Sequence, residues 1–427
     1  MGKKLLVVGS GGREHALVWK LAQSPAVEKI YAAPGNPGMM QLAECVNIAV
    51  DDIEALCKFA RENEIDLTVV GPEAPLTLGI ADRFKREGLL IFGPSAAAAR
   101  LEGSKVFSKN LFKKYGIPTA RFEVFDDAEQ ARDFARRLFA EGQGAVVKAD
   151  GLAAGKGVVV AGSFAEASEA IDSIMKDKTF GAAGDKILVE ECLQGEELSF
   201  FAISDGSDYL ALLSAQDHKR IFNHDEGPNT GGMGAYTNPP LYTEELKQQI
   251  IAQVIEPTIR AMQAEGCPYQ GVLYAGLMIT PDGPKVLEYN ARFGDPEAQV
   301  LMPMIKSDLL PILEAAAQGQ LPGQTVEINP GACVGVVLAA GGYPGTYQKG
   351  DAITGLDQLQ DDTLVFQAGT ALQDNQLVTA GGRVMAVVAC ADSIPSAIAK
   401  VYGEVEKIHF KDMHYRHDIG QKALRQS

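Results

Sequence analysis

The stretch KKLLVVGSGGREHALVWKLAQ, residues 3–23, decides how the chain begins to fold. It starts as an apolar run, turns through glycines and continues with apolar residues at helical spacing, which predicts a strand, a tight turn and a helix. Strands that alternate with helices form parallel sheets. We therefore predict a parallel α/β unit over roughly residues 1–100. Its further strands are expected at residues 29–35, 45–50, 66–73 and 89–95.

The pattern changes after residue 102. A helix and a strand near Phe122 are expected first, followed by two apolar strands joined by a glycine-rich loop and then by further strands. The tail from about residue 332 is strand-rich and ends in a helix, which is typical of an α+β domain. The longer helices are expected over residues 127–139, 243–265 and 396–406.

Composition excludes several classes of partner. The formal net charge of -16 argues against nucleic acid or an anionic membrane surface as a partner, because both would repel the chain.

The six cysteines lie far apart and form no CxxC motif, so neither a zinc site nor a disulfide framework is predicted. The N-terminal apolar run is too short for a signal peptide and no transmembrane stretch follows. We expect a cytoplasmic protein.

The first glycine turn nearly fits the dinucleotide-binding pattern GxGxxG. Gly9 and Gly11 match, but Glu14 stands in the position of the third glycine, and the second predicted strand ends in YAAPGN without an acidic residue. These departures argue against NAD. The free N–H groups of the turn, at Gly11 and Gly12, favour a single phosphate at the helix N-terminus. A tight turn without a ligand is the alternative.

The segment GLAAGKG, residues 151–157, resembles a P-loop without being one. Three residues separate its glycines where four are required, and Gly157 stands where Ser or Thr would bind magnesium. A glycine loop between two strands can instead close over phosphates as a flap. Lys148, on the strand before the loop, would point its cation at the same phosphates.

The segment KVLEYN, residues 285–290, predicts a metal site. Glu288 and Asn290 are two residues apart on a strand and therefore share one face. Two hard oxygen ligands side by side suit Mg²⁺, which proteins bind with one or two groups plus nucleotide phosphates. The alternative is a salt-bridged acid beside a structural amide. Arg292 is expected on the same face, where it could hold a transferring phosphoryl group.

The segment VEECLQGEEL, residues 189–198, is compatible with an adenine-binding hinge. Backbone groups around Glu191 and Leu193 would bind the base, and Glu197 would bind the ribose hydroxyls. A surface hairpin with acidic residues is the alternative.

Taken in order, Lys105, Lys148 with its glycine loop, EECL with Glu197, and Glu288 with Asn290 resemble the ATP-grasp superfamily. Within it, RFGDPE, PNTGGMGAY, GSGGREHAL and KADGLAAGKGV are similar to the motifs of the glycinamide ribonucleotide synthetase family. The resemblance covers essentially the whole chain. It implies a Rossmann-like domain over residues 1–101, an ATP-grasp region over 102–327 with a flap subdomain at about 122–190, and a C-terminal domain over 328–427.

The resemblance also implies a reaction. ATP would phosphorylate the carboxylate of glycine, and the amine of 5-phosphoribosylamine would attack the acyl phosphate, with Mg²⁺ or Mn²⁺ as cofactor. A monomer that binds only small molecules is expected. The chain departs from the wider superfamily in one place, because YAGLM, residues 274–278, lacks the further acidic metal ligand that many members carry there.

Roles follow from the same resemblance. Glu288 and Asn290 would bind metal, and Lys148 and Arg292 would serve catalysis. The ATP contacts would be Lys105, Lys148, Glu190, Glu191, Leu193, Glu197, Arg220 and Asn229. The substrates would meet Gly11, Gly12, Glu73, Asp217, Arg292 and Gly294, with Asp217 receiving the ammonium group of glycine.

Three other functions compete with this one. Another ATP-grasp ligase, such as a carboxylating enzyme, would use a different acid or amine. A nucleotide-binding regulatory module would not turn ATP over, so an assay of ADP release separates it. A Rossmann oxidoreductase would bind nicotinamide.

Overall fold

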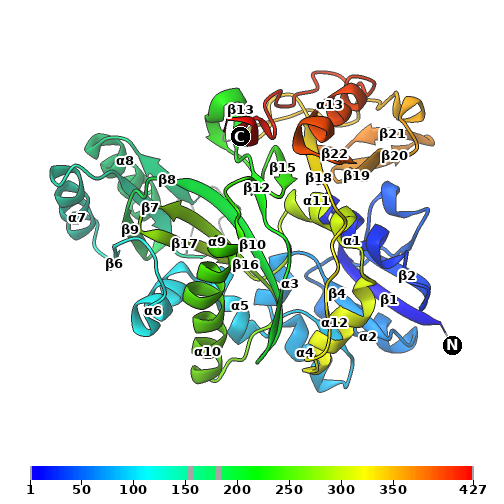
Figure 1. The fold of residues 1–427 in the computed structure, drawn as a ribbon, viewed down its shortest axis with the longest axis horizontal. Helices are drawn as coiled ribbons and strands as arrows, with labels where there is room; N and C mark the ends of the chain where they lie inside the picture. The colour runs from blue at the N-terminus through cyan, green and yellow to red at the C-terminus, as the bar shows by residue number, and fades with distance from the viewer. Residues whose placement is uncertain (1, 152–156, 178–183, 426–427) are drawn as a thin grey trace.

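The computed structural model describes residues 2–151, 157–177 and 184–425. Its N-terminal part is a five-stranded parallel sheet in the order β3-β2-β1-β4-β5 (Figure 1). Helices connect the strands, as the alternating sequence pattern predicts. The sheet consists of β1 (Lys3–Gly9), β2 (Val27–Pro34), β3 (Glu44–Cys45), β4 (Leu67–Val70) and β5 (Ile91–Phe92). Its helices are α1 (Gly12–Leu21), α2 (Ile53–Glu62), α3 (Glu73–Thr77), α4 (Ile80–Arg86) and α5 (Ala96–Gly103).

One predicted strand is much shorter than expected. The run at residues 45–50 was predicted as a strand, but pairing in β3 stops at Cys45. Val46, Ile48 and Val50 instead pack their side chains against the core. The apolar alternation therefore anchors an irregular segment, which sequence periodicity alone does not distinguish from a strand.

A second sheet has nine strands and runs through the middle of the molecule. Its main path is β17-β16-β10-β12-β15-β18-β22-β19, all paired antiparallel, and β11 pairs with β10. The sheet is continuous from the central region into the C-terminal region, because β15 pairs with β18. The strands are β10 (Glu196–Asp205), β11 (Tyr209–Ala211), β12 (Ala215–Asp217), β15 (Gly234–Thr237), β16 (Gln270–Thr280), β17 (Gly283–Asn290), β18 (Ala332–Ala339), β19 (Leu364–Gln367) and β22 (Arg383–Ala391).

A third, four-stranded antiparallel sheet forms a separate lobe at the left of Figure 1, with its own core. Its order is β6-β9-β7-β8, and α7 and α8 pack on it. The glycine loop predicted as a flap joins β7 to β8, and its residues 152–156 lie outside the described residues. The lobe contains β6 (Phe122–Phe125), α7 (Ala128–Ala140), β7 (Ala145–Ala149), β8 (Val158–Ala161), α8 (Phe164–Met175) and β9 (Ile187–Glu191).

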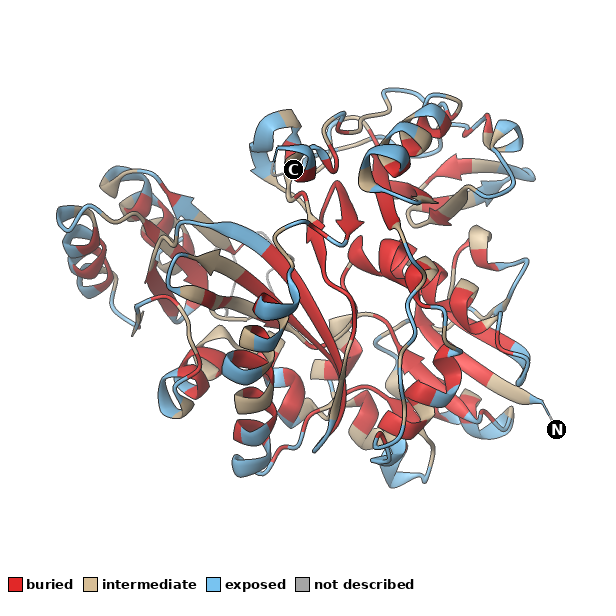
Figure 2. Ribbon diagram, in the orientation of Figure 1, coloured by how far each residue is buried: buried red, intermediate tan, exposed pale blue. Residues whose placement is uncertain are grey.

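The strands of the large sheet are mostly buried (Figure 2). The long helix predicted over residues 243–265 is present as α9 (Glu244–Ile250), η4 (Ile251–Ile255) and α10 (Glu256–Ala264). Among the described helices, none is long and apolar enough to cross a membrane. The other helices are η1 (Pro37–Met39), α6 (Lys105–Tyr115), η3 (Asn223–Asp225), α11 (Glu297–Met304), α12 (Leu309–Gln318), η5 (Leu356–Gln358), α13 (Ile394–Val405) and α14 (Gln421–Leu424).

The glycine-rich segment 217–236 contains paired strands. The hairpin of β13 (Arg220–Phe222) and β14 (Glu226–Asn229) is anchored by Arg416, which is fully buried. The Arg416 guanidinium lies 2.8 Å from Asp225 Oδ1 and 2.7 Å from Asp418 Oδ2. A second small hairpin consists of β20 (Thr370–Gln373) and β21 (Gln376–Thr379).

The anchor predicts a pH dependence of stability. Burial opposes the charge of Asp225, but Lys422 and Arg416 outweigh it and lower the pKa of Asp225 to about 2. A carboxylate whose folded pKa is lowered stabilises the fold above its unfolded pKa of about 3.9, and this contribution is lost as pH falls toward the folded pKa. Asp225→Asn should therefore lower the free energy of unfolding at pH 6, and its difference from wild type should shrink between about pH 4 and pH 2.

Urea denaturation at several pH values measures this difference. Asp361→Asn, which changes an exposed carboxylate, is the matched control and should stay close to wild type throughout. A constant Asp225→Asn difference down to pH 2 would contradict the assignment.

Candidate active site

Glu288 and Asn290 share one face of β17. In the register with β16, Glu288 lies opposite Gly276 and Asn290 opposite Tyr274. Tyr289 between them points into the core, where its hydroxyl lies 2.5 Å from Thr258 Oγ1. The predicted alternation is therefore confirmed by the strand geometry.

Positive charges surround Glu288. Burial alone would raise the pKa of its carboxyl, but four nearby cations outweigh burial and lower it. They belong to Lys219, Lys148, Lys105 and Arg292. The structure thus brings together Lys105, Lys148, Arg292 and Glu288, which lie on separate segments of the chain. Such a gathering of cations suits a group with several negative oxygens, such as a triphosphate.

The pair Glu288 and Asn290 fits a hard divalent cation, because both present oxygen ligands on one face. Among the described residues, no group of three or more His, Cys, Asp or Glu side chains could hold an ion. An ion at this pair would therefore complete its coordination with water and nucleotide phosphates, which is the usual state of Mg²⁺.

Lys148 is held in place by Glu190. Its Nζ lies 3.1 Å from Glu190 Oε1 and donates to the Leu287 carbonyl at 3.1 Å. Lys109, which sequence reasoning missed, occupies the other oxygen, Glu190 Oε2, at 2.8 Å. Two lysines thus bind the carboxylate of Glu190. We predict from the sequence that Glu190 contacts ATP, but in the structure its carboxylate is not free to bind a nucleoside. Its position on the strand next to β7 makes it a support for Lys148.

The predicted hinge follows β9. Glu191 is fixed to the chain before β6, because its Oε1 accepts from the Arg121 N–H at 2.9 Å. Leu193 lies half-buried just beyond β9. Glu197 on β10 binds Lys219, whose Nζ lies 2.7 Å from Glu197 Oε2.

Three further predicted contacts lie at a helix start and in a hairpin. Lys105, at the start of α6, donates from Nζ to the Gly151 carbonyl at 2.9 Å, which ties it to the start of the glycine loop. Arg220 and Asn229 are directly paired in the β13–β14 hairpin. Arg220 donates to the Gly227 carbonyl at 2.6 Å.

Asp217 ends β12 beside Lys219. Burial and the carboxylates of Glu297 and Glu197 raise the pKa of Asp217 to about 7, against the opposing charge of Lys219. Lys219 was also missed by sequence reasoning. Its position two residues after Asp217, near a strand end, is the signal that could have found it.

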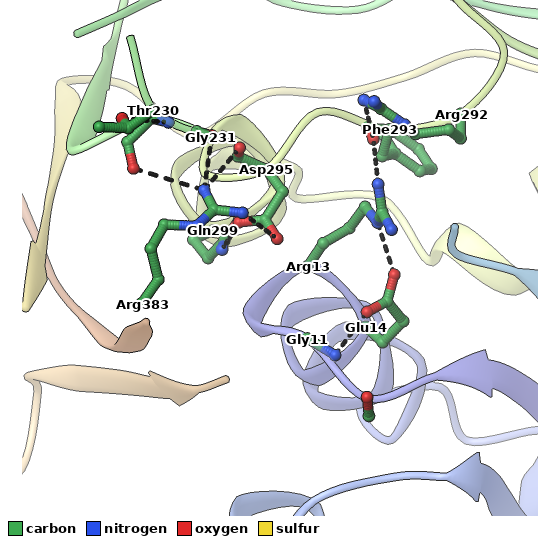
Figure 3. Close-up of polar contacts among 12 residues, drawn as sticks. Gly11, Arg13, Glu14, Thr230, Gly231, Arg292, Phe293, Asp295, Gln299 and Arg383 are labelled. Atoms are coloured by element: carbon green, nitrogen blue, oxygen red, sulfur yellow. Dashed lines mark hydrogen bonds and ion pairs between the residues drawn. The ribbon is translucent and has the colours of Figure 1, made fainter. Parts of the chain in front are cut away.

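The first glycine turn is already occupied by a side chain of the protein. The Gly11 N–H donates to Glu14 Oε2 at 2.7 Å, and Arg13 binds the other oxygen of the same carboxylate (Figure 3). A methyl group on Gly71 would lie only 2.1 Å from Glu14 Oε1, so the carboxylate fills the space above the turn. The expectation of a free N–H at Gly11 is therefore wrong, because Glu14 caps the helix. Gly12 packs under Gln299.

Arg292 lies just beyond β17 between two carboxylates. Its guanidinium contacts Glu73 Oε2 at 3.2 Å and Glu102 Oε1 at 2.8 Å. The structure therefore brings the two predicted substrate residues Arg292 and Glu73 together. Glu102, missed in the sequence, also accepts from the Ala291 N–H at 2.7 Å.

Asp295 is bound by an arginine from the C-terminal region. Arg383, at the start of β22, contacts Asp295 Oδ2 at 3.0 Å and donates to the Gly231 carbonyl at 2.6 Å (Figure 3). A methyl group on Gly231 would lie 3.0 Å from the guanidinium carbon, so the guanidinium lies against the glycine. Gly294 is equally constrained, since Glu297 Oε2 lies 2.2 Å from the site of its missing methyl group.

These features define the class. A Glu and Asn pair at a strand end, lysines close to it, and a lobe with its own sheet are features typical of the ATP-grasp class, and the ATP-grasp (A) domain model of one family matches residues 103–298. Solved structures at low identity share this fold, among them a biotin carboxylase from Campylobacter jejuni with TM-score 0.74, 16% identity, and coverage of 97% of this chain and 93% of that chain.

The chain belongs to the phosphoribosylglycinamide synthetase family. The family's N domain matches residues 3–102, its ATP-grasp (A) domain residues 103–298 and its C domain residues 333–422. Phosphoribosylamine–glycine ligase of Halalkalibacterium halodurans is 51% identical over 98% of this chain and 97% of its own length. That of Caldanaerobacter subterraneus is 50% identical over 97% and 99%. The crystal structure of the Thermotoga maritima enzyme matches with TM-score 0.85 and 34% identity over 97% of this chain and 99% of that chain.

The contacts of Arg383 predict that it holds the loop at Gly231 and Gly232 against Asp295. Arg383→Lys keeps the charge but loses the planar fork that reaches a carboxylate and a carbonyl together. Hydrogen bonds of charged groups contribute about 1.5–3 kcal/mol, so backbone amides of residues 229–234 should exchange roughly 10- to 100-fold faster.

Hydrogen–deuterium exchange read by mass spectrometry measures this change. The matched control is Arg136→Lys, at an exposed arginine paired with Asp133 on α7, and it should leave residues 229–234 unchanged. Equal exchange in Arg383→Lys and wild type would show that the loop is held by other contacts.

Proposed function

We propose that this chain joins the carboxyl group of glycine to the amine of 5-phosphoribosylamine and converts ATP to ADP and phosphate. Family membership and relatives of about 50% identity over nearly the whole chain support this activity, which is a step of purine biosynthesis. The observation that carries it is Glu288 among the cations Lys105, Lys148, Lys219 and Arg292. This charge distribution is suited to the terminal phosphates of ATP.

The nucleotide would lie between the separate lobe and the large sheet. Glu191, Leu193 and Glu197 would bind the nucleoside, with Arg220 and Asn229 above the phosphates. Glu190 supports this arrangement indirectly, because it holds Lys148 at a fixed position. Solved structures with this fold include a carboxylase domain in complex with the magnesium salt of ADP.

Phosphoryl transfer would be promoted by positioning and by charge. A carboxylate resists attack because it is negatively charged, and phosphorylation gives it a leaving group. Lys148 and Arg292 would balance the charge on the γ-phosphoryl group as it moves to the glycine oxygen. Mg²⁺ or Mn²⁺ held by Glu288 and Asn290 would supply further neutralisation of the phosphates.

The second substrate would lie against the N-terminal sheet. Glu73 at the start of α3 contacts Arg292, and both would meet this substrate, with Gly294 near Arg292 in the chain. Glu73 would receive hydroxyl or amine groups of 5-phosphoribosylamine, and Gly11 and Gly12 would line the same side. Asp217 would receive the ammonium group of glycine.

We further propose the domain limits 1–101, 102–327 with the lobe at about 122–190, and 328–427, and a monomer located in the cytoplasm. The separate core of the lobe supports its treatment as a subdomain.

Glu288→Gln should abolish turnover without unfolding the protein. The neutral amide weakens metal binding at the triphosphate, and removal of one such electrostatic group costs roughly 100- to 1000-fold in rate. ADP release at limiting Mg²⁺ measures the effect, and thermal unfolding checks the fold. Glu245→Gln, on the exposed face of α9, is the matched control. Activity within a few-fold of wild type would contradict the assignment of Glu288 to the metal site.

The reaction should pass through an acyl phosphate. The cations gather around Glu288, where the end of the triphosphate would lie, so they suit loss of the γ-phosphoryl group. Glycine labelled with ¹⁸O in its carboxylate should transfer one labelled oxygen to inorganic phosphate, with ADP as the other product.

The label distinguishes the competing reactions. Label in AMP, with release of pyrophosphate, would falsify the acyl phosphate route. Turnover with another carboxylic acid but not with glycine would support phosphoryl transfer by this fold. It would contradict glycine as the substrate. Absence of ADP release with every acid would favour a regulatory module.

A further inference from the structure

Two cysteines from distant parts of the sequence lie side by side in the large sheet. Cys333 on β18 and Cys390 on β22 are direct partners in the antiparallel register, and their Sγ atoms are 2.8 Å apart. Both are free thiols in this structure. Sequence spacing gave no sign of the pair, because 57 positions separate the two residues.

The backbone around this pair has the geometry that a disulfide needs. The Cys333 N–H donates to Thr237 Oγ1 at 2.9 Å, and the Val337 N–H donates to the Met233 carbonyl at 3.0 Å, so both groups point toward the β15 side and away from β22. Cys333 and Cys390 are therefore a non-hydrogen-bonded pair of β18 and β22. In such a pair the Cα atoms are about 4.5 Å apart and the side chains are close. Disulfides bridge Cα separations of about 4.4–6.8 Å.

The two thiols differ in access. Cys333 is fully buried, whereas Cys390 is partly exposed. The hydrogen bond between the two sulfurs lowers the pKa of Cys390 against the effect of burial, and the charge of Lys400 lowers it further. An external reagent can therefore reach the sulfur of Cys390. Cys333 is the buried second thiol, next to Cys390.

We propose that Cys333 and Cys390 are a site of covalent modification that forms an internal disulfide by exchange with a low-molecular-weight disulfide such as oxidised glutathione. The Cys390 thiolate attacks one sulfur of the reagent, which forms a mixed disulfide and releases one reagent thiolate. The Cys333 thiolate then attacks Cys390 Sγ and releases the second. Two protein thiols lose their protons and two electrons, and the reagent becomes two thiols.

The disulfide would join strands that are already paired, so the native fold need not change. It would close a loop between residues 333 and 390 and restrict the unfolded chain, which raises stability. Arg383, which holds the active-site loop, lies at the opposite end of β22. The inference does not depend on the proposed function.

The test uses the full chain incubated with oxidised glutathione. The number of titratable thiols should fall from six to four, since two thiols become one bond, and peptide mapping should link residues 333 and 390. The midpoint of thermal unfolding should rise by about 5 °C and return after reduction.

Single variants separate the two steps. Cys333→Ser should stop at a stable glutathione adduct on Cys390, because the second sulfur is missing. Cys390→Ser should keep Cys333 unmodified. Cys45→Ser, at a half-buried cysteine remote in sequence, is the matched control and should still form the link.

Three results would overturn the proposal. They are six unmodified thiols in the wild-type protein, a glutathione adduct on wild-type Cys390 that never resolves, and equal loss of thiols in the Cys333→Ser/Cys390→Ser double variant.

Discussion

The contact between Arg383 and Asp295 joins parts of the chain that are far apart in sequence and that meet beside the candidate site. Asp295 follows the strand that carries Glu288, Gly231 belongs to the loop after the β13–β14 hairpin, and Arg383 begins β22. Burial would raise the pKa of Asp295, but Arg383 and Arg13 outweigh it and lower the pKa, so the carboxylate stays charged. One guanidinium thus fixes the relative position of two loops that the large sheet alone would leave free at their ends.

The charge of the whole chain and the charge around Glu288 have opposite signs. The chain carries a formal net charge of -16, which repels anions at long range, yet four cations gather around Glu288. Each is tied to an acceptor of the protein: Lys148 to Glu190, Lys219 to Glu197, Arg292 to Glu73 and Glu102, and Lys105 to the Gly151 carbonyl. Such partners hold flexible cationic side chains in place before a ligand arrives, which lowers the entropy cost of binding.

The sequence predicts those features that depend on a single strand or on neighbouring elements. The alternation around Tyr289 predicts that Glu288 and Asn290 share a face, and the strand and helix pattern of residues 3–23 predicts the N-terminal sheet. The sequence does not predict contacts between residues that are distant along the chain. Lys109, Glu102 and Arg383 meet their partners only through the tertiary fold. Helix α11 was also missed, because it is short and contains Pro303.

The carboxylate of Glu14 reverses the chemical preference of the first glycine turn. A bare turn of this kind offers N–H donors to anions, but here the carboxyl group of Glu14 lies over Gly9, Gly11 and Gly71. The Gly11 N–H that a bare turn would offer to an anion is already bound by this carboxylate, which Arg13 also binds. The position of the third glycine in the dinucleotide-binding pattern is thus taken here by a residue whose carboxylate caps the turn itself.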